Sequence, residues 1–208
     1  MQLTSSSFID QGMIPGEFAF AVTATENHIQ LSSNRNPDLS WLNAPSQTQS
    51  FALICHDPDV PSQGDQVNQE GQTIPAELPR VDFYHWVLIN IPASETQIAA
   101  GTHSSSITAK GKSVTQTPIG LAGINDYTAW FKGDPNMSGD YYGYDGPCPP
   151  WNDSIKHHYV FTIYALDIKK LELTGPFTGN DALQAMSPHI LDKASITGVY
   201  SLNPSLKL

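Results

Sequence analysis

The side chains that could support chemistry in this sequence are carboxylates and imidazoles beside apolar segments. Asp57 and Asp59 end one such segment, and His85 stands near the start of a second. His157 starts a third, two residues before Tyr159. A carboxylate beside imidazoles can coordinate a metal ion, assist a nucleophile or help to bind an anion. Each residue taken alone also has a structural explanation, as a solvated turn residue or a hydrogen-bonded core side chain.

Residue spacing disfavours two of these three functions. The sequence has no H-x-H or H-E-x-x-H pattern, and the adjacent His157 and His158 would point to opposite faces of a strand, so no metal is expected. No G-x-S-x-G pattern supplies a nucleophile, so a hydrolase is disfavoured and no catalytic residue is assigned. Anion recognition by imidazoles and the backbone N–H groups of a proline-braced loop is favoured. A carboxylate in the same pocket would also suit an ammonium group.

The apolar run 51–56 predicts the strand that positions the two aspartates. Alternate residues from Phe51 to Asp57, including Cys55, would share one face. Because proline donates no backbone hydrogen bond, we expect this strand to stop near Pro58. The following turn, Asp57 to Pro61, would then hold both acids still.

Two further strands would carry the histidines. Residues 83–91 predict one strand, with His85, Val87 and Ile89 on the same face. Residues 157–166 predict the other. The polar stretch 62–81 is long for a connection, which is typical of a functional loop. Residues 93–150 contain many turn formers, with aromatic residues between positions 127 and 144, and end in the rigid loop Gly146–Pro150.

One helical signal lies near the C-terminus, after an N-cap at Thr178. The apolar residues at roughly helical spacing are Ala182, Leu183, Met186, Ile190, Leu191 and Ala194. Pro188 predicts that this segment splits into two short helices, which end before Gly198.

Composition limits the class of protein. The formal net charge of −10, with ten Lys and Arg residues in 208, argues against nucleic acid as a partner. No apolar run is long enough to span a membrane, and the N-terminus lacks the features of a signal peptide, so a cytoplasmic protein is expected. The two cysteines, Cys55 and Cys148, are expected to be reduced. We expect a single domain over residues 1–208.

Several motifs, in this order along the chain, resemble those of the phosphatidylethanolamine-binding proteins (PEBP), and most closely their bacterial branch. They are Asp57-Pro-Asp-Val-Pro61, His85-Trp86, Gly146-Pro-Cys-Pro-Pro150 and His157-His-Tyr-Val-Phe161, supported by Asn36-Pro-Asp-Leu-Ser-Trp41 and Gly123-Ile-Asn-Asp-Tyr127. The resemblance covers nearly the whole chain. It implies a mainly β fold, with a large antiparallel sheet packed on a smaller sheet and short C-terminal helices.

The resemblance also implies a small anion pocket at one end of the sheet. The residues it assigns to ligand binding are Asp57, Asp59, Pro61, Phe83, His85, Gly146, Cys148, Pro149, His157 and Tyr159. It further implies a cis bond between Val60 and Pro61. The chain departs from the family in the longer loop 62–81, in an apparent insertion at 128–142, and at Cys148, which the resemblance brings near Cys55.

These observations predict a non-enzymatic protein, without a cofactor, that binds an anionic small molecule or a phospholipid head group and regulates other proteins. His85, His157 and the backbone of Gly146–Cys148 would donate hydrogen bonds together with the Tyr159 hydroxyl. Asp57 would orient a histidine or meet an ammonium group. Binding would strengthen at low pH as the histidines become charged. The alternatives are a kinase- or protease-inhibitor-type protein that acts through the pocket rim, and an uncharacterised hydrolase. The resemblance also allows a homodimer.

Overall fold

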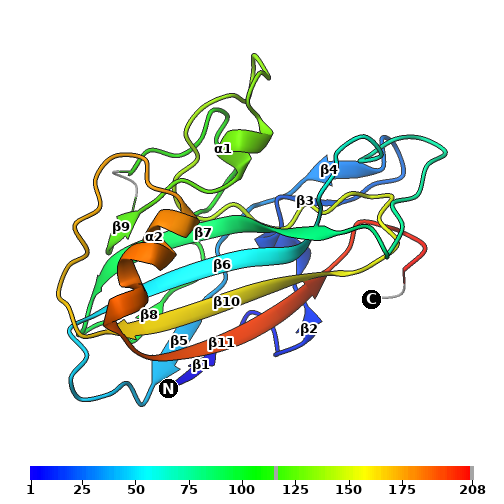
Figure 1. The fold of residues 1–208 in the computed structure, drawn as a ribbon. Helices are drawn as coiled ribbons and strands as arrows, with labels where there is room; N and C mark the ends of the chain where they lie inside the picture. The colour runs from blue at the N-terminus through cyan, green and yellow to red at the C-terminus, as the bar shows by residue number, and fades with distance from the viewer. Residues whose placement is uncertain (115–116, 207–208) are drawn as a thin grey trace.

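A six-stranded sheet forms the centre of the protein (Figure 1). The computed structural model describes residues 1–114 and 117–206. The strands of the large sheet follow the order β2-β11-β10-β6-β7-β9, and all neighbours are antiparallel except β2 and β11. Their bounds are β2 Gly12–Met13, β6 Ser50–Pro61, β7 Arg80–Pro92, β9 Leu121–Ala122, β10 His157–Leu166 and β11 Ile190–Tyr200.

Smaller elements surround this sheet. A three-stranded sheet consists of β1 (Gln2–Thr4), β5 (Leu39–Leu42) and β8 (Gln97–Ile98), and β3 (Ala21–Thr23) pairs with β4 (Ile29–Leu31) as a hairpin. The helical elements are η1 Gly16–Phe18, α1 Tyr127–Trp130, α2 Gly179–Met186 and η3 Ser187–His189. The expected fold class, a large sheet on a smaller one with short C-terminal helices, is confirmed.

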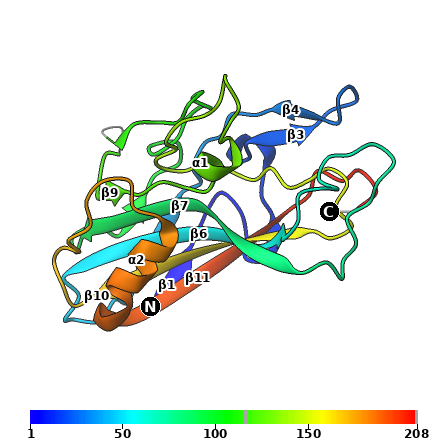
Figure 2. The ribbon, with the colours of Figure 1, turned by 45° about the horizontal axis from the view of Figure 1, so that its top comes forward.

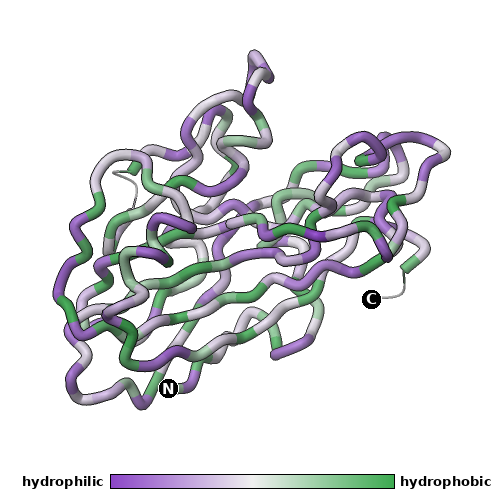
Figure 3. Tube along the Cα trace, in the orientation of Figure 1, coloured by the Kyte–Doolittle hydropathy of each residue, from purple (hydrophilic) through white to green (hydrophobic). Residues whose placement is uncertain are grey.

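The central strands are buried on both faces, so hydrophobic residues run along them almost continuously (Figure 3). One face of β6, with Phe51, Leu53 and Cys55, packs in a core that includes Trp41 of the small sheet. The other face, which includes Ala52 and Ile54, packs with α2 and residues near it. Figure 2 shows α2 lying across this second face. The predicted alternation of β6 between Phe51 and Cys55 is therefore confirmed.

The C-terminal prediction is correct in its first half and wrong in its second. Thr178 and Asp181 form a reciprocal capping box that begins α2, and η3 contains Pro188. From Ile190 onward, however, the chain is a strand paired with β10. Its residues Ile196, Gly198 and Tyr200 are buried at every second position, which is strand periodicity. The apolar residues at positions 190, 191 and 194 matched helical spacing by coincidence.

Two expectations about the proline-rich turn are also wrong. Strand β6 continues through Pro58 and ends at Pro61, which pairs with Arg80 of β7. The ladder tolerates Pro58 because an irregularity in pairing lies there, where a backbone N–H is not required. Throughout residues 1–114 and 117–206 every peptide bond is trans, including the bond from Val60 to Pro61.

Two smaller observations bear on the class of protein. Cys55 and Cys148 are both free thiols, as expected. Within the described part of the chain, the helices are all too short to cross a bilayer.

Candidate functional site

A β-bulge in β7 directs His85 into a pocket at one end of the large sheet. Trp86 pairs with Cys55 and Tyr84 pairs with His56, so His85 is an extra residue between them. A bulge places two consecutive side chains on one face. Consequently His85 lies on the same side as Trp86, and the prediction that it shares a face with Val87 is wrong. Val87 packs in the core beneath α2.

A second irregularity, in β6, separates the two aspartates. Asp57 pairs with Phe83 and Val60 pairs with Val81, which leaves one residue of β6 unmatched around Pro58 and Asp59. Asp57 is therefore on the pocket side, whereas Asp59 is on the opposite face of the sheet. Asp59 is consequently not in the wall of the pocket that the resemblance assigned to it, although its backbone N–H donates to Asp57 Oδ1 at 2.8 Å.

The pocket has a volume of about 510 Å³ and a largely aromatic and apolar lining. Asp57 of β6, His85 of β7 and Tyr159 of β10 come from three adjacent strands and form its polar floor. The assigned residues Pro61, Phe83, Cys148 and Pro149 also line it. The further lining residues are Phe20, Ile29, Leu31, Val60, Gly64, Val67, Asn68, Tyr127, Trp130, Phe131, Met137 and Pro150.

His85 is held as a neutral imidazole. Its Nδ1 lies 2.7 Å from the carbonyl oxygen of Asp145, and because a carbonyl only accepts, Nδ1 carries the proton. Burial lowers the pKa of His85 to about 4, despite the nearby Asp57 carboxylate and this backbone hydrogen bond, which act to raise it. The remaining nitrogen, Nε2, therefore has a free lone pair. His85 thus presents an acceptor at Nε2, where the sequence analysis expected a donor.

His157 lies behind the floor of the pocket, with no exposed surface. Its Nδ1 is 2.7 Å from Asp57 Oδ2, and its Nε2 is 3.1 Å from Asp153 Oδ2. Burial by itself would lower the pKa of His157, but the hydrogen bonds and charges of the two aspartates raise it to about 9. Both nitrogens of His157 are paired with aspartates, so it has no N–H left for a ligand, contrary to the expectation. As an imidazolium it neutralises the carboxylate that does reach the pocket.

Asp153 extends this buried network to an arginine. Arg80 Nη1 and Nη2 donate to its two carboxylate oxygens at 2.5 and 3.0 Å, a bidentate pair. Burial would raise the pKa of Asp153, but hydrogen bonds from His157 and Arg80 lower it. The buried network beneath the apolar pocket thus pairs two carboxylates, Asp57 and Asp153, with two cations, His157 and Arg80.

A second buried network positions the loop after Tyr144. The Asp145 carboxylate accepts from Lys112 Nζ and Asn34 Nδ2, both at 2.7 Å, and from Asn125 Nδ2 at 2.9 Å. Burial raises the pKa of Asp145 in spite of the adjacent lysine. Of these two networks the sequence predicted one pair, since Asp57 was expected to orient a histidine and does so with His157. The other members were not predicted, because they lie far apart along the chain.

Gly146 is buried next to this network and does not line the pocket. Its N–H donates to Asn34 Oδ1 at 2.8 Å, and its carbonyl accepts from the Tyr127 hydroxyl at 2.8 Å. A Cβ at this position would lie 2.1 Å from the carbonyl oxygen of Phe18. The glycine is therefore required by close packing, and its N–H is not free for an anion.

Loops from three parts of the chain form the pocket walls. Residues 64–68 and 130–137 contribute from the two segments that the sequence marked as unusual, and β4 contributes Ile29 and Leu31. His28 stacks on Trp151, with ring centroids 3.7 Å apart, and its Nε2 lies 2.6 Å from Glu70. This contact joins the β3–β4 hairpin to the loop after β6. The aromatic-rich stretch 127–144 was a usable signal for one wall, but nothing in the sequence indicated the hairpin.

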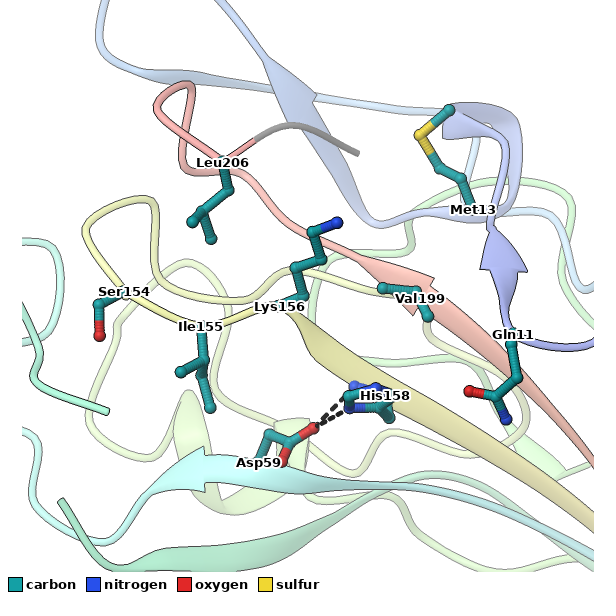
Figure 4. Close-up of a pocket in the computed structure, with 9 residues that line it drawn as sticks. All are labelled: Gln11, Met13, Asp59, Ser154, Ile155, Lys156, His158, Val199 and Leu206. Atoms are coloured by element: carbon teal, nitrogen blue, oxygen red, sulfur yellow. Dashed lines mark hydrogen bonds and ion pairs between the residues drawn. The ribbon is translucent and has the colours of Figure 1, made fainter. Parts of the chain in front are cut away.

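A separate depression of about 660 Å³ lies on the other face of the sheet (Figure 4). Asp59 Oδ2 accepts from the backbone N–H of His158 at 2.9 Å and lies 2.7 Å from its Nδ1. Ser154 also lines the depression, but its side chain points away from His158 in Figure 4. These three residues therefore do not form a nucleophile–base arrangement.

Known proteins are similar to this chain over nearly its full length. A family model described as phosphatidylethanolamine-binding protein matches residues 4–201. A UPF0098 protein of Methanothermobacter thermautotrophicus is 31% identical over 200 residues, covering 96% of this chain and 98% of the relative. The UPF0098 protein YbhB of Escherichia coli is 26% identical, with 97% and 100% coverage.

Solved structures agree with this match. The crystal structure of E. coli YbcL, described as a new member of the mammalian PEBP family, has a TM-score of 0.68 at 24% identity and covers 96% of this chain and 97% of its own. A PEBP homolog of Chlamydia trachomatis, CT736, has a TM-score of 0.64 at 26% identity, with 96% of both chains covered.

Proposed function

Because the chain belongs to the phosphatidylethanolamine-binding protein family, we propose that it is a non-enzymatic binding protein whose pocket holds a small phosphate-like or phosphoethanolamine-type group. A phosphorylated metabolite and a phospholipid head group both present this chemistry. The free thiols of Cys55 and Cys148 support a cytoplasmic location for this role.

The observation that carries the proposal is the convergence of Asp57, His85 and Tyr159 on one pocket. Three adjacent strands bring an ionised acid, a lone pair and a hydroxyl to the floor of an apolar cavity. Burial raises the pKa of Tyr159 well above its ordinary value, and its interaction with Asp57 adds to this rise, so the hydroxyl keeps its proton. A few convergent polar groups in an apolar concavity are typical of a site for a small molecule.

Calorimetric titration with phosphate and with phosphoethanolamine tests the proposal. We expect His85→Ala to weaken binding of either compound at least tenfold, because a hydrogen bond to a charged group contributes about 1.5–3 kcal/mol. His158→Ala is the matched control, since this neighbouring histidine faces the other side of the sheet. Equal affinity in wild type and His85→Ala would show that the pocket is assigned wrongly.

A protein-binding role through the rim, of the kinase- or protease-inhibitor type, is the second candidate. It is favoured by two large apolar side chains at the mouth, Leu31 and Trp130, whose exposed fractions are 64% and 53%. A second copy of the chain would be one such partner. Binding of a partner that Trp130→Ser abolishes and His85→Ala leaves intact would favour this role over the first.

A further inference from the structure

We propose that the pocket selects anions that bring a proton with them, such as the monoanion of a phosphate monoester, and rejects sulfate esters of the same shape. This inference rests on the proposed function and specifies its ligand class. It follows from the hydrogen-bonding character of the pocket floor, where His85 and Asp57 present acceptors and the Tyr159 hydroxyl is already hydrogen-bonded to Asp57.

Two acceptors face the ligand space. The Asp57 carboxylate is one, and its charge is retained because His157 and Arg80 balance the buried network behind it. The other is the lone pair on His85 Nε2. A fully deprotonated anion placed here would meet a carboxylate and a lone pair without supplying a hydrogen to either. Burying the unpaired lone pair of His85 under such an anion, beside a carboxylate of the same charge, is unfavourable, whereas a P–OH group would donate a hydrogen bond to Nε2.

The Asp145 network fixes His85 in this acceptor form. In the other tautomer the proton would be on Nε2. The lone pair of Nδ1 would then lie against the Asp145 carbonyl oxygen, 2.7 Å away. That carbonyl cannot retreat easily, because the side chain of the same residue is anchored to Lys112, Asn34 and Asn125. We therefore assign Asp145 as a positioning residue for the pocket.

None of the described residues that line the pocket supplies a cation that could bind the anion in place of a charged His85. Among the described lining residues there is no lysine and no arginine. Burial holds the pKa of the Cys148 thiol at about 12, so it stays uncharged and donates only weakly. The groups that surround His85 from the packed elements are Asp57 of β6, His157 and Tyr159 of β10, Tyr127 of α1 and the Asp145 carbonyl. His56 of β6 acts on it only from the opposite face of the sheet.

Phenyl phosphate and phenyl sulfate are the probes, because they share a ring and a tetrahedral anion and differ in the exchangeable proton. We expect phenyl phosphate to bind at least tenfold more tightly near pH 6. Its affinity should fall up to about tenfold for each pH unit above its second pKa, which is about 6 for phosphate monoesters, as the monoanion disappears. Equal affinity for the two esters, or phosphate binding that is unchanged up to about pH 8, would overturn the inference.

His85→Gln provides a second test, since its amide can rotate to offer an N–H to the ligand. We expect the preference for phosphate over sulfate to shrink toward one in this variant and the pH dependence to flatten. A preference that persists unchanged would overturn the inference. Should the variant not fold, ¹⁵N NMR of wild-type His85 decides the point: protonated Nδ1 with unprotonated Nε2 near pH 7 supports it, and the reverse overturns it.

The two levels of the proposal fail differently. If neither ester binds in a His85-dependent manner, the anion-binding function itself is wrong. If both esters bind equally and His85→Ala abolishes both, the function stands and the proton selectivity is wrong.

Discussion

The imidazolium of His157 should stabilise the fold in a pH window that differs from that of most histidines. Its pKa rises from an ordinary 6.5 to about 9 in the folded protein, because Asp153 and Asp57 outweigh the effect of burial. A pKa that is higher in the folded state gives stability that is complete below about pH 6.5 and is lost as the pH rises through about 9. At 1.36 kcal/mol for each pH unit between these values, the contribution is about 3 kcal/mol.

Urea unfolding of wild type and His157→Gln at several values between about pH 6 and 9 measures this contribution. The difference in free energy of unfolding between the two proteins should be largest near pH 6 and smaller by about 3 kcal/mol near pH 9. His158→Gln is the control, because its side chain is 45% exposed and pairs with Asp59 at the surface, where such pairs contribute less than about 1 kcal/mol. A difference in unfolding free energy between wild type and His157→Gln that is constant over this range would refute the conclusion that His157 is charged and paired with both aspartates.

Three further predictions concern the pocket and its supports. Lys112→Met should reduce the free energy of unfolding by about 3–5 kcal/mol at neutral pH, because it leaves the buried Asp145 carboxylate without its cation. The loss should be smaller at acidic pH, because burial raises the pKa of the Asp145 carboxyl and the protonated group needs no cation, and denaturation at neutral and acidic pH measures it. Gly146→Ala should cost about 1–3 kcal/mol by overpacking against Phe18 and should also weaken phosphate binding, as thermal unfolding and calorimetry would show. In a series from ethyl to butyl phosphate, affinity should rise about fourfold per methylene, and Phe131→Ala should flatten this slope.

The central sheet could be predicted because its strands bury both faces. The segments 51–55, 86–89 and 159–166, which became the buried middles of β6, β7 and β10, are mainly apolar, aromatic or β-branched, and such runs have few alternative structures. The segment that became β11 was harder, since Ile190, Leu191 and Ala194 fit two periodicities. Pairing with β10 decided between them, and pairing is a property of the whole sheet.

The residue types of the site could be predicted from the sequence, but not the face of the sheet on which each side chain lies. Asp57 and His85 were recognisable beside their strands, yet the faces of Asp59 and His85 depend on two bulges. A bulge arises from the register between two strands, which neither strand encodes alone. The sequence analysis expected Asp57 to orient a histidine, as it does with His157, but nothing in the sequence indicated Asp153 as the second partner.

The bulge at His85 divides β7 into two segments of opposite parity. On the rim side of the bulge, odd-numbered residues such as Phe83 face the pocket, while beyond it even-numbered residues such as Trp86 and Leu88 face the same way into the core. Inserting one residue between Tyr84 and His85 would move Tyr84 to the position of Phe83 at the ligand and leave the core segment in register. Pocket shape and core packing can therefore change independently, through a single-residue change of length within one continuous strand.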